Sequence, residues 1–123
     1  MAKRILVIED QPDNRRILRD LLGTVGYDLT EAENGALGVE SALAEPPDLI
    51  LMDIQMPEMD GYEATRRIKA DPRGAAVPII AVTSFALSGD EAKAREAGCD
   101  DYVAKPYSPR EMLAKVVEYV GPA

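Results

Sequence analysis

An aspartate stands at the end of a strongly apolar stretch of the chain. The residues "LILM" (49–52) are followed by Asp53 and then by the turn-rich segment "IQMPEMDGYE" (54–63). An apolar run of this length predicts a buried β-strand. Asp53 is therefore expected where a core strand meets its loop, and its carboxylate needs a role there.

Polar or charged residues also end three other predicted strands. They are Glu9 and Asp10 after "RILVI", Thr83 and Ser84 in "PIIAVTS", and Lys105 and Pro106 in "DYVAKP". In a parallel sheet the carboxyl ends of the strands share one edge, which is where such sheets place their binding sites. We therefore expect these residues to meet although they are far apart in sequence.

Three carboxylates at one edge need a cation between them. Without one, Glu9, Asp10 and Asp53 would repel one another and raise one another's pKa. The chain has no histidine and one cysteine, Cys99, so oxygen ligands and a hard ion are favoured, Mg²⁺ before Zn²⁺. Mg²⁺ usually takes one or two carboxylates and leaves room for a phosphate oxygen.

A lysine and a hydroxyl beside such a cluster favour phosphoryl transfer. The Lys105 ammonium would neutralise charge on an incoming phosphoryl group, and the Thr83 hydroxyl would hydrogen-bond one of its oxygens. Asp53 would then be the nucleophile and carry an acyl phosphate. Each residue alone is better explained as a helix cap, a turn or an ordinary strand end. Their joint placement at four strand ends favours the chemical interpretation.

The segments between these positions predict an alternation of strands and helices. Strands are expected at 4–9, 28–33, 48–53, 78–84 and 101–106, with 28–33 at an edge. Helices are expected at 13–25, 35–44, 61–70 and 88–98 and from Ser108 onward, the last two opened by Ser-x-x-Glu capping boxes. Five such repeats without a linker predict an α/β fold, a parallel sheet between two layers of helices.

Composition limits the classes of partner. The 123 residues fit one domain, and 22 acids against 14 bases give a net charge of −8, which disfavours nucleic acid or an anionic membrane as the main partner. The chain shows neither a signal peptide nor an apolar run long enough to span a bilayer, so a cytoplasmic location is expected. Cys99 has no second cysteine or histidine and is expected to be a packing thiol.

These residues resemble the receiver domain of two-component response regulators. The motifs are "LVIED", "LILMDIQMPEMDGYEATRRIK", "PIIAVTSFA" and "EAGCDDYVAKP", in the family's order and spacing from Ile5 to the last helix. The resemblance implies a CheY-like, flavodoxin-like (βα)5 doubly wound sheet with strand order 2-1-3-4-5. It also implies a single receiver domain over residues 1–123, with no output domain.

The resemblance assigns a role to each site residue. It makes Asp53 the phosphoacceptor, with Thr83 and Lys105 contacting the phosphoryl group. It makes Asp10 a direct Mg²⁺ ligand, Glu9 a ligand mostly through water, and Asp53 and the backbone carbonyl of Gln55 further ligands.

A second group of residues resembles the family's switch. Thr83 and Ser84 would move toward the phosphoryl group, and the ring of Tyr102 would turn inward to fill the space. Pro106 would follow a cis peptide bond, and Pro57 and Gly61 match the loop and helix start after the acceptor. The changes would appear on the face built by residues 86–120. Gln55, Ser84 and Phe85 flank the path of an attacking water, which suggests a longer phosphoryl lifetime.

The resemblance further implies the partners. A histidine kinase or a histidine phosphotransfer protein would donate the phosphoryl group, and the output would be a contact with downstream proteins. The segment from Ala81 to Ser108 looks like single-domain regulators of the DivK type, which control histidine kinases, whereas "MDIQMPEMDGYEAT" is also typical of receivers in hybrid histidine kinases. A monomer is expected, acting as a switch that assists its own phosphorylation and dephosphorylation rather than as an enzyme.

Two other classes of function remain as alternatives. A phosphotransferase or phosphatase with an Asp nucleophile typically carries a second acid two residues later, where this chain has Gln55, and needs a cap. A flavodoxin-like cofactor binder would want a Ser-, Thr- and Gly-rich loop in place of "EDQPDNR". A non-phosphorylated adaptor of the receiver fold would have lost Asp53, Thr83 or Lys105, and all three are present.

Overall fold

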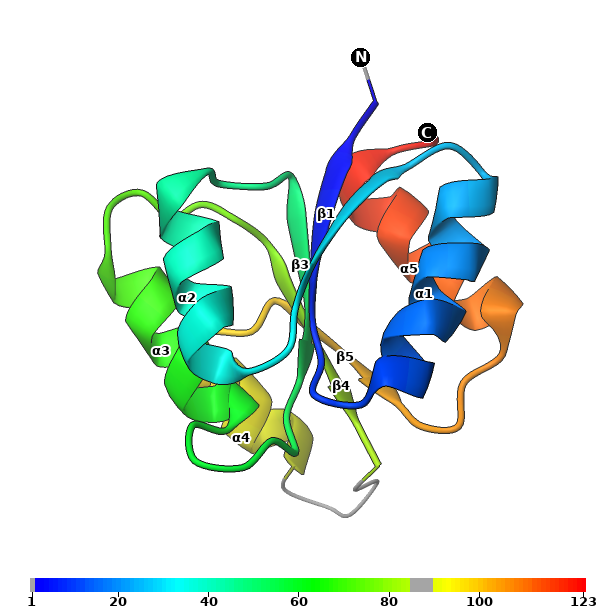
Figure 1. Ribbon diagram of the computed structural model, residues 1–123. Coiled ribbons are helices and arrows are strands. Elements are labelled where there is room, and N and C mark those ends of the chain that lie inside the picture. The colour runs from blue at the N-terminus through cyan, green and yellow to red at the C-terminus, as the bar shows by residue number, and fades with distance from the viewer. Residues whose placement is uncertain (1, 85–89) are drawn as a thin grey trace.

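A computed structural model describes residues 2–84 and 90–123 of the chain (Figure 1). Its strands are β1 (Arg4–Ile8), β2 (Asp28–Ala32), β3 (Leu49–Asp53), β4 (Ile79–Thr83) and β5 (Asp101–Ala104). Its helices are α1 (Pro12–Thr24), α2 (Gly35–Ala44), α3 (Gly61–Ala70), α4 (Asp90–Ala97) and α5 (Pro109–Val120).

The five strands form one parallel sheet in the order β2-β1-β3-β4-β5. The doubly wound α/β prediction and the strand order are thus confirmed. The order reverses beside β1, and the carboxyl ends of β1 and β3 lie next to each other at that point. In open α/β sheets this reversal is where a binding crevice forms.

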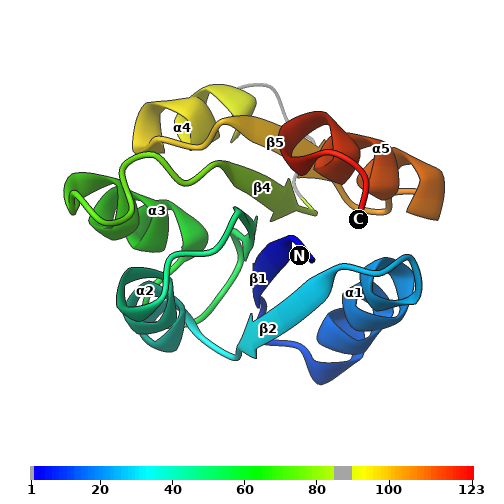
Figure 2. The same ribbon diagram turned by 90° about the horizontal axis from the view of Figure 1, so that it is seen from above.

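The helices cover both faces of the sheet. Viewed from above, α1 and α5 lie on one face and α2, α3 and α4 on the other (Figure 2). Alternate residues of β1 and β3 enter two separate cores: Leu6 and Ile50 point toward α2 and α3, whereas Val7 and Leu51 point toward α1 and α5. Burial on both faces explains why these strands read as continuous apolar runs.

The ends of the elements differ slightly from the sequence-based ranges. α1 begins at Pro12, whose missing N–H suits the first turn of a helix. The ladder between β4 and β5 ends at the pair Thr83 and Ala104, so Lys105 and Pro106 belong to the following loop rather than to the strand. The capping box of Ser108 and Glu111 is present, whereas the one expected at Ser88 lies outside the described residues.

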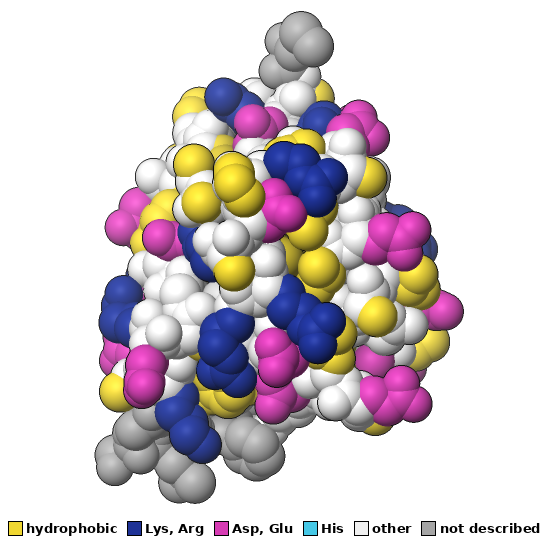
Figure 3. Space-filling view, turned by 90° about the vertical axis from the view of Figure 1, so that its left-hand side faces the viewer, with side chains coloured by type: hydrophobic (Ala, Val, Ile, Leu, Met, Phe, Trp, Pro, Cys, Tyr) yellow, Lys and Arg dark blue, Asp and Glu magenta, His cyan; other side chains and the backbone are white. Residues whose placement is uncertain are grey.

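The structure also places Cys99 and shows the surface over α2 and α3. Cys99 is buried with its Sγ 3.6 Å from Thr65 Oγ1, and burial raises the pKa of its thiol, as for a packing residue. Among the described residues, no helix combines the length and the apolar character needed to cross a membrane. On the face over α2 and α3, the described basic and acidic side chains are intermixed with small apolar areas (Figure 3).

Candidate functional site

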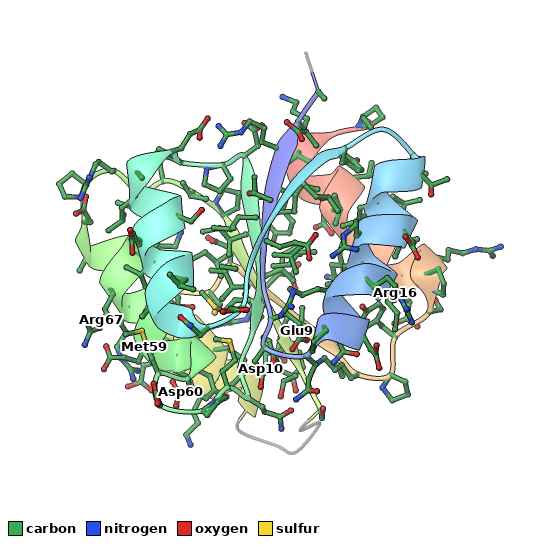
Figure 4. All side chains as sticks on the ribbon, viewed as in Figure 1. Glu9, Asp10, Arg16, Met59, Asp60 and Arg67 are labelled. Carbon is green, nitrogen blue, oxygen red and sulfur yellow. The ribbon has the colours of Figure 1, made fainter. Side chains whose placement is uncertain are left out.

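Glu9, Asp10 and Asp53 form an acidic cluster at the carboxyl ends of β1 and β3. One carboxylate oxygen from each lies within 4.8 Å of the others. The register explains the meeting, because Ile8 pairs with Met52 and the next residues along the two strands are Glu9 and Asp53. Figure 4 shows Glu9 and Asp10 at the lower end of the sheet.

The Glu9 carboxylate is held by two donors. Its Oε2 accepts a hydrogen bond from the Gln11 N–H at 3.0 Å, and its Oε1 lies 3.2 Å from Lys105 Nζ. The residue is only 3% exposed. A carboxylate so engaged on both oxygens is better placed to orient its neighbours than to bind an ion by itself.

Asp10 is the incompletely satisfied member of the cluster. Its Oδ1 is buried and has no hydrogen-bond partner within residues 2–84 and 90–123, while its Oδ2 lies 3.5 Å from Gln11 Nε2. A buried acceptor without a partner is costly and calls for an explanation such as a bound ion. Three clustered carboxylates and an orphaned oxygen fit a hard divalent cation such as Mg²⁺.

Asp53 is buried at the end of β3, with 4% of its surface exposed. Burial, together with the charge and proximity of Glu9, raises the pKa of Asp53 to about 7. Lys105, whose Nζ lies 3.5 Å from Asp53 Oδ1, and the Gln55 N–H, 3.3 Å from the same oxygen, act in the opposite direction. A cation beside this carboxylate would favour its charged form further.

Thr83 is the last residue of β4, the strand on the other side of β3, and Ser84 follows it. Asp53 pairs with Val82, so Thr83 lies one residue beyond it and is fully buried. The Ser84 N–H donates to Gln55 Oε1 at 3.3 Å, which joins the loop after β4 to the loop after β3. Phe85, expected beside these residues, lies outside the described part of the chain.

Tyr102 is half-buried on β5 and packs against the core that contains Ala81. It pairs with Ala81 across the β4–β5 ladder, two residues before Thr83 on β4. Because alternate residues of a strand share a face, Thr83 and Ala81 project to the same side of the sheet. The two expected switch residues are therefore close neighbours, although their movement stays a prediction.

The loop after β5 carries Lys105 to the acidic cluster. Its backbone N–H donates to the Thr83 carbonyl at 2.6 Å, and the Lys105–Pro106 peptide bond is cis, as expected. A recess of about 540 Å³ opens beside Asp53 and Lys105, and Ile17, Leu18 and Tyr107 form part of its apolar wall. The charged residues of the site thus lie next to an apolar surface on α1.

The start of α3 packs directly behind Asp53. Gly61 donates its N–H to the Ile54 carbonyl at 3.0 Å, and a Cβ added to Gly61 would lie 2.5 Å from the Asp53 carbonyl oxygen. Asp60 caps the helix by accepting the Glu63 N–H at 2.9 Å. The need for glycine at position 61 therefore comes from the close approach of two backbones.

Sequence reasoning did not find three contacts that shape the site. The Gln11 N–H holds the Glu9 carboxylate, and the Gln55 side chain reaches Ser84. A third, from Arg15 to the Glu9 carbonyl, is equally invisible to periodicity. Each of these contacts depends on a side-chain rotamer. The position of Gln11 next to Glu9 and Asp10 was the only feature of the sequence that pointed to one of them.

The fold and the site together define a CheY-like receiver, and known proteins agree. A sequence model described as the response regulator receiver domain matches residues 5–117. The polar-differentiation response regulator DivK of Brucella anthropi is 40% identical over 123 residues, 100% of each chain, and that of Brucella ovis is 39% identical over the same span. The chain belongs to the response regulator receiver family.

Two solved structures resemble this chain closely. The receiver domain of a sensor histidine kinase from Pseudomonas aeruginosa, solved with a magnesium ion in its active-site cleft, is 40% identical with a TM-score of 0.91, over 98% of this chain and 99% of that one. Vibrio cholerae CheY4 has a TM-score of 0.91 at 21% identity, over 97% and 99% of the two chains, and supports the fold alone.

Proposed function

We propose that this chain is a phosphoacceptor switch that takes a phosphoryl group onto Asp53 from a histidine kinase or a histidine phosphotransfer protein. The observation that carries the proposal is the joint position of Asp53, Lys105 and the orphaned Asp10 oxygen. In this proposal Asp53 attacks, Lys105 neutralises charge, and a cation binds Asp10 Oδ1, which has no hydrogen-bond partner among the described residues. The acceptance of a phosphoryl group is general for the receiver family.

In the proposed transfer, an Asp53 carboxylate oxygen bonds to phosphorus as the phosphorus–nitrogen bond of the donor's phosphohistidine breaks. Asp53 must be ionised to attack, and Lys105 and the Gln55 N–H favour that form. Lys105 also lies where it can neutralise an oxygen of the transferred group. Mg²⁺, held by Asp10 and Asp53 with the Gln55 carbonyl and Glu9 through water, would supply positive charge to the phosphoryl oxygens.

The recess beside Asp53 supports a protein donor. Its apolar wall on α1 includes Ile17, whose surface is 53% exposed. An exposed isoleucine beside a buried nucleophile is a suitable contact for the apolar surface of a partner. We propose that the protein carrying the phosphohistidine docks there.

The face formed by α4, β5 and α5, which we call the output face, would transmit the signal. Phosphorylation adds about −1.5 to −2 charge at Asp53. Thr83 and Ser84 would be drawn toward that charge, and Tyr102 would follow, because Tyr102 neighbours β4 on the same side of the sheet. A downstream protein would then read the shifted population of the output face.

The relatives indicate two settings for this switch. Full-length similarity to DivK favours a single-domain regulator, whereas 40% identity to the receiver of a sensor histidine kinase favours a receiver within a hybrid kinase. In either setting we propose a cytoplasmic, monomeric switch that is not an enzyme in its own right. Its partners would be proteins rather than nucleic acid or membrane, in keeping with the net charge of −8.

The proposal is tested by intact-mass measurement after exposure to a small acyl-phosphate donor. Wild type and Asp53→Asn would be compared with Mg²⁺ and with EDTA. A single phosphoryl adduct on wild type that requires Mg²⁺ and is lost in Asp53→Asn is the expected result. No adduct on wild type with Mg²⁺, from either a small donor or a phosphohistidine protein, would contradict the proposal and favour the adaptor alternative.

A further inference from the structure

Arg15 reaches from α1 to the backbone that carries the acidic cluster. Its Nη1 donates to the Glu9 carbonyl oxygen at 2.8 Å, and its side chain is only 16% exposed. The residue lies in the first turn and a half of α1, where its own N–H donates to the Gln11 carbonyl at 3.1 Å. The guanidinium therefore folds back over the turn between β1 and α1.

The opposite side of the Arg15 guanidinium is anchored by Glu31 on β2. Arg15 Nε lies 3.5 Å from Glu31 Oε1. The Glu31 carboxylate also accepts two hydrogen bonds from Arg19, at 2.6 and 2.7 Å. The hydrogen bond and charge of Arg19, with the charge of Arg15, hold the pKa of Glu31 below its ordinary value despite partial burial. Arg15 thus joins an ionised residue of the edge strand to the Glu9 carbonyl.

The Glu9 carbonyl is part of the peptide group that links Glu9 to Asp10. Because a peptide group is planar, fixing its oxygen also fixes the direction in which the chain enters Asp10. The neighbouring contacts hold the same turn: the Glu9 N–H donates to the Ala32 carbonyl at 3.0 Å, and the Glu9 carboxylate accepts the Gln11 N–H. Arg15 is the side chain that restrains the peptide plane directly before the orphaned Asp10 oxygen.

We infer that Arg15 is a positioning residue for the divalent cation, holding Asp10 ready to bind it. The inference rests on the proposed function, since it concerns the cation of the same site. Residues that orient metal ligands from behind typically change metal affinity by about 10–100-fold when they are removed. Arg15 acts on the backbone rather than on the carboxylate itself, so we expect the lower end of that range, about 10-fold.

The chain offers a matched control in Arg19. It lies four residues later on the same helix and pairs with the same Glu31, but it is 53% exposed and its hydrogen bonds go to Glu31. Removing Arg19 therefore weakens the link to β2 while leaving the Arg15 hydrogen bond to Glu9 in place. Any loss specific to Arg15 comes from the contact with the peptide group.

The test is calorimetric titration of Mg²⁺ into wild type, Arg15→Ala and Arg19→Ala, together with urea unfolding of each in EDTA. We expect Arg15→Ala to bind Mg²⁺ about 10-fold more weakly and Arg19→Ala to stay within about 2-fold of wild type. Urea unfolding detects a purely structural role, which would lower the unfolding midpoint of Arg15→Ala and leave the Mg²⁺ affinity of the folded protein unchanged.

Equal Mg²⁺ affinities for wild type and Arg15→Ala would overturn the inference while leaving the proposed function intact. If wild type itself bound no Mg²⁺, the proposed function and this inference would both fall. Should Arg15→Ala not fold, Arg15→Met against Arg19→Met gives the same comparison. Methionine keeps much of the side-chain bulk but has no N–H to donate to the Glu9 carbonyl, so equal affinities in that pair would also overturn the inference.

Discussion

Lys105 Nζ lies 3.5 Å from Asp53 Oδ1, although the two residues are separated by more than 50 positions in the chain. The same ammonium lies 3.2 Å from Glu9 Oε1, so Lys105 connects the proposed acceptor to the residue before Asp10, the proposed metal ligand. In the resting state it lowers the repulsion between two buried carboxylates. After the proposed transfer, the same position would allow it to contact a phosphoryl oxygen.

Replacing Lys105 by methionine is expected to slow phosphorylation of Asp53. The variant keeps much of the side-chain bulk but removes the only cation that the structure records within 4.0 Å of Asp53 among its described residues. Loss of one such stabilising group typically costs about 10²–10³ in rate. The measurement is the rate of adduct formation from a small acyl-phosphate donor at saturating Mg²⁺, with the exposed Lys3→Met as control. A rate equal to that of wild type would remove Lys105 from the proposed chemistry.

The raised pKa of Asp53 predicts how stability depends on pH. Its pKa is about 7 in the folded protein and near 3.8 when unfolded, so between these values the folded state binds more protons. The free energy of unfolding therefore decreases as pH rises through this window and levels off above about pH 7. Asp53→Asn lacks this decrease.

Without Mg²⁺, the free energy of unfolding of Asp53→Asn relative to wild type should therefore rise by about 2–3 kcal/mol between about pH 5 and pH 8. Urea unfolding at the two pH values measures the difference. Mg²⁺ should narrow it, because the ion stabilises the charged carboxylate of wild type alone. A difference that does not change with pH would show that Asp53 is ionised throughout.

The contact between Gln55 and Ser84 is expected to lengthen the lifetime of the phosphoryl group on Asp53. The Gln55 side chain spans the loops after β3 and β4, beside Asp53. Its loss opens a path for water and removes one hydrogen bond, worth about 1 kcal/mol or a factor of about five. Gln55→Ala is therefore expected to lose the adduct about fivefold faster than wild type, as followed by intact mass over time.

Gln55→Met is the matched control for that experiment, because it keeps the bulk and removes the amide. A lifetime close to that of wild type in the methionine variant would assign the effect to exclusion of water. A lifetime close to that of the alanine variant would assign it to the hydrogen bond. An alanine variant that holds its phosphoryl group as long as wild type would contradict the predicted role of Gln55.

Gly61→Ala is expected to destabilise the protein and disturb the site. The new Cβ would lie 2.5 Å from the Asp53 carbonyl oxygen and 2.7 Å from Ile54 Cα, so backbone must shift. Overpacking of this kind costs about 1–3 kcal/mol. Chemical unfolding measures the loss, and a parallel Mg²⁺ titration should show weakened binding.

Gly23→Ala provides the opposite case on α1. A Cβ at Gly23 meets nothing within 4 Å, and alanine is about 0.5–1 kcal/mol better than glycine inside a helix. That variant should be slightly more stable than wild type. Equal effects of the two substitutions would show that the close approach behind Asp53 is not the reason for glycine at position 61.

Much of the fold could be predicted because its strands are buried on both faces. Continuous apolar runs marked β1, β3 and β4, while β2 at the edge alternates weakly and was correctly expected there. The end of β5 was placed two residues too late, because "DYVAKP" gives no sequence signal that the ladder stops at Ala104. Helix ends depend on local capping residues, and for that reason the start of α5 at Ser108 could be predicted.

The positions of the site residues could be predicted from the sequence, but the hydrogen bonds and ion pairs that connect them could not. Parallel topology brings Glu9, Asp10, Asp53 and Lys105 to one edge, and that placement follows from strand ends alone. Which carboxylate oxygen stays unpaired, and that Arg15 holds the peptide before Asp10, depend on rotamers and on the packing of α1. Local sequence does not encode these choices; the three-dimensional arrangement of the turn decides them.

The most direct test of the central claim is to locate the phosphoryl group on the chain. An acyl phosphate on aspartate is reduced by borohydride to homoserine, which tandem mass spectrometry assigns to one residue. Homoserine is expected at position 53, formed only when a phosphoryl donor and Mg²⁺ were both present. Homoserine at position 10, the corresponding reduced product at Glu9, or no reduced residue at all would contradict it.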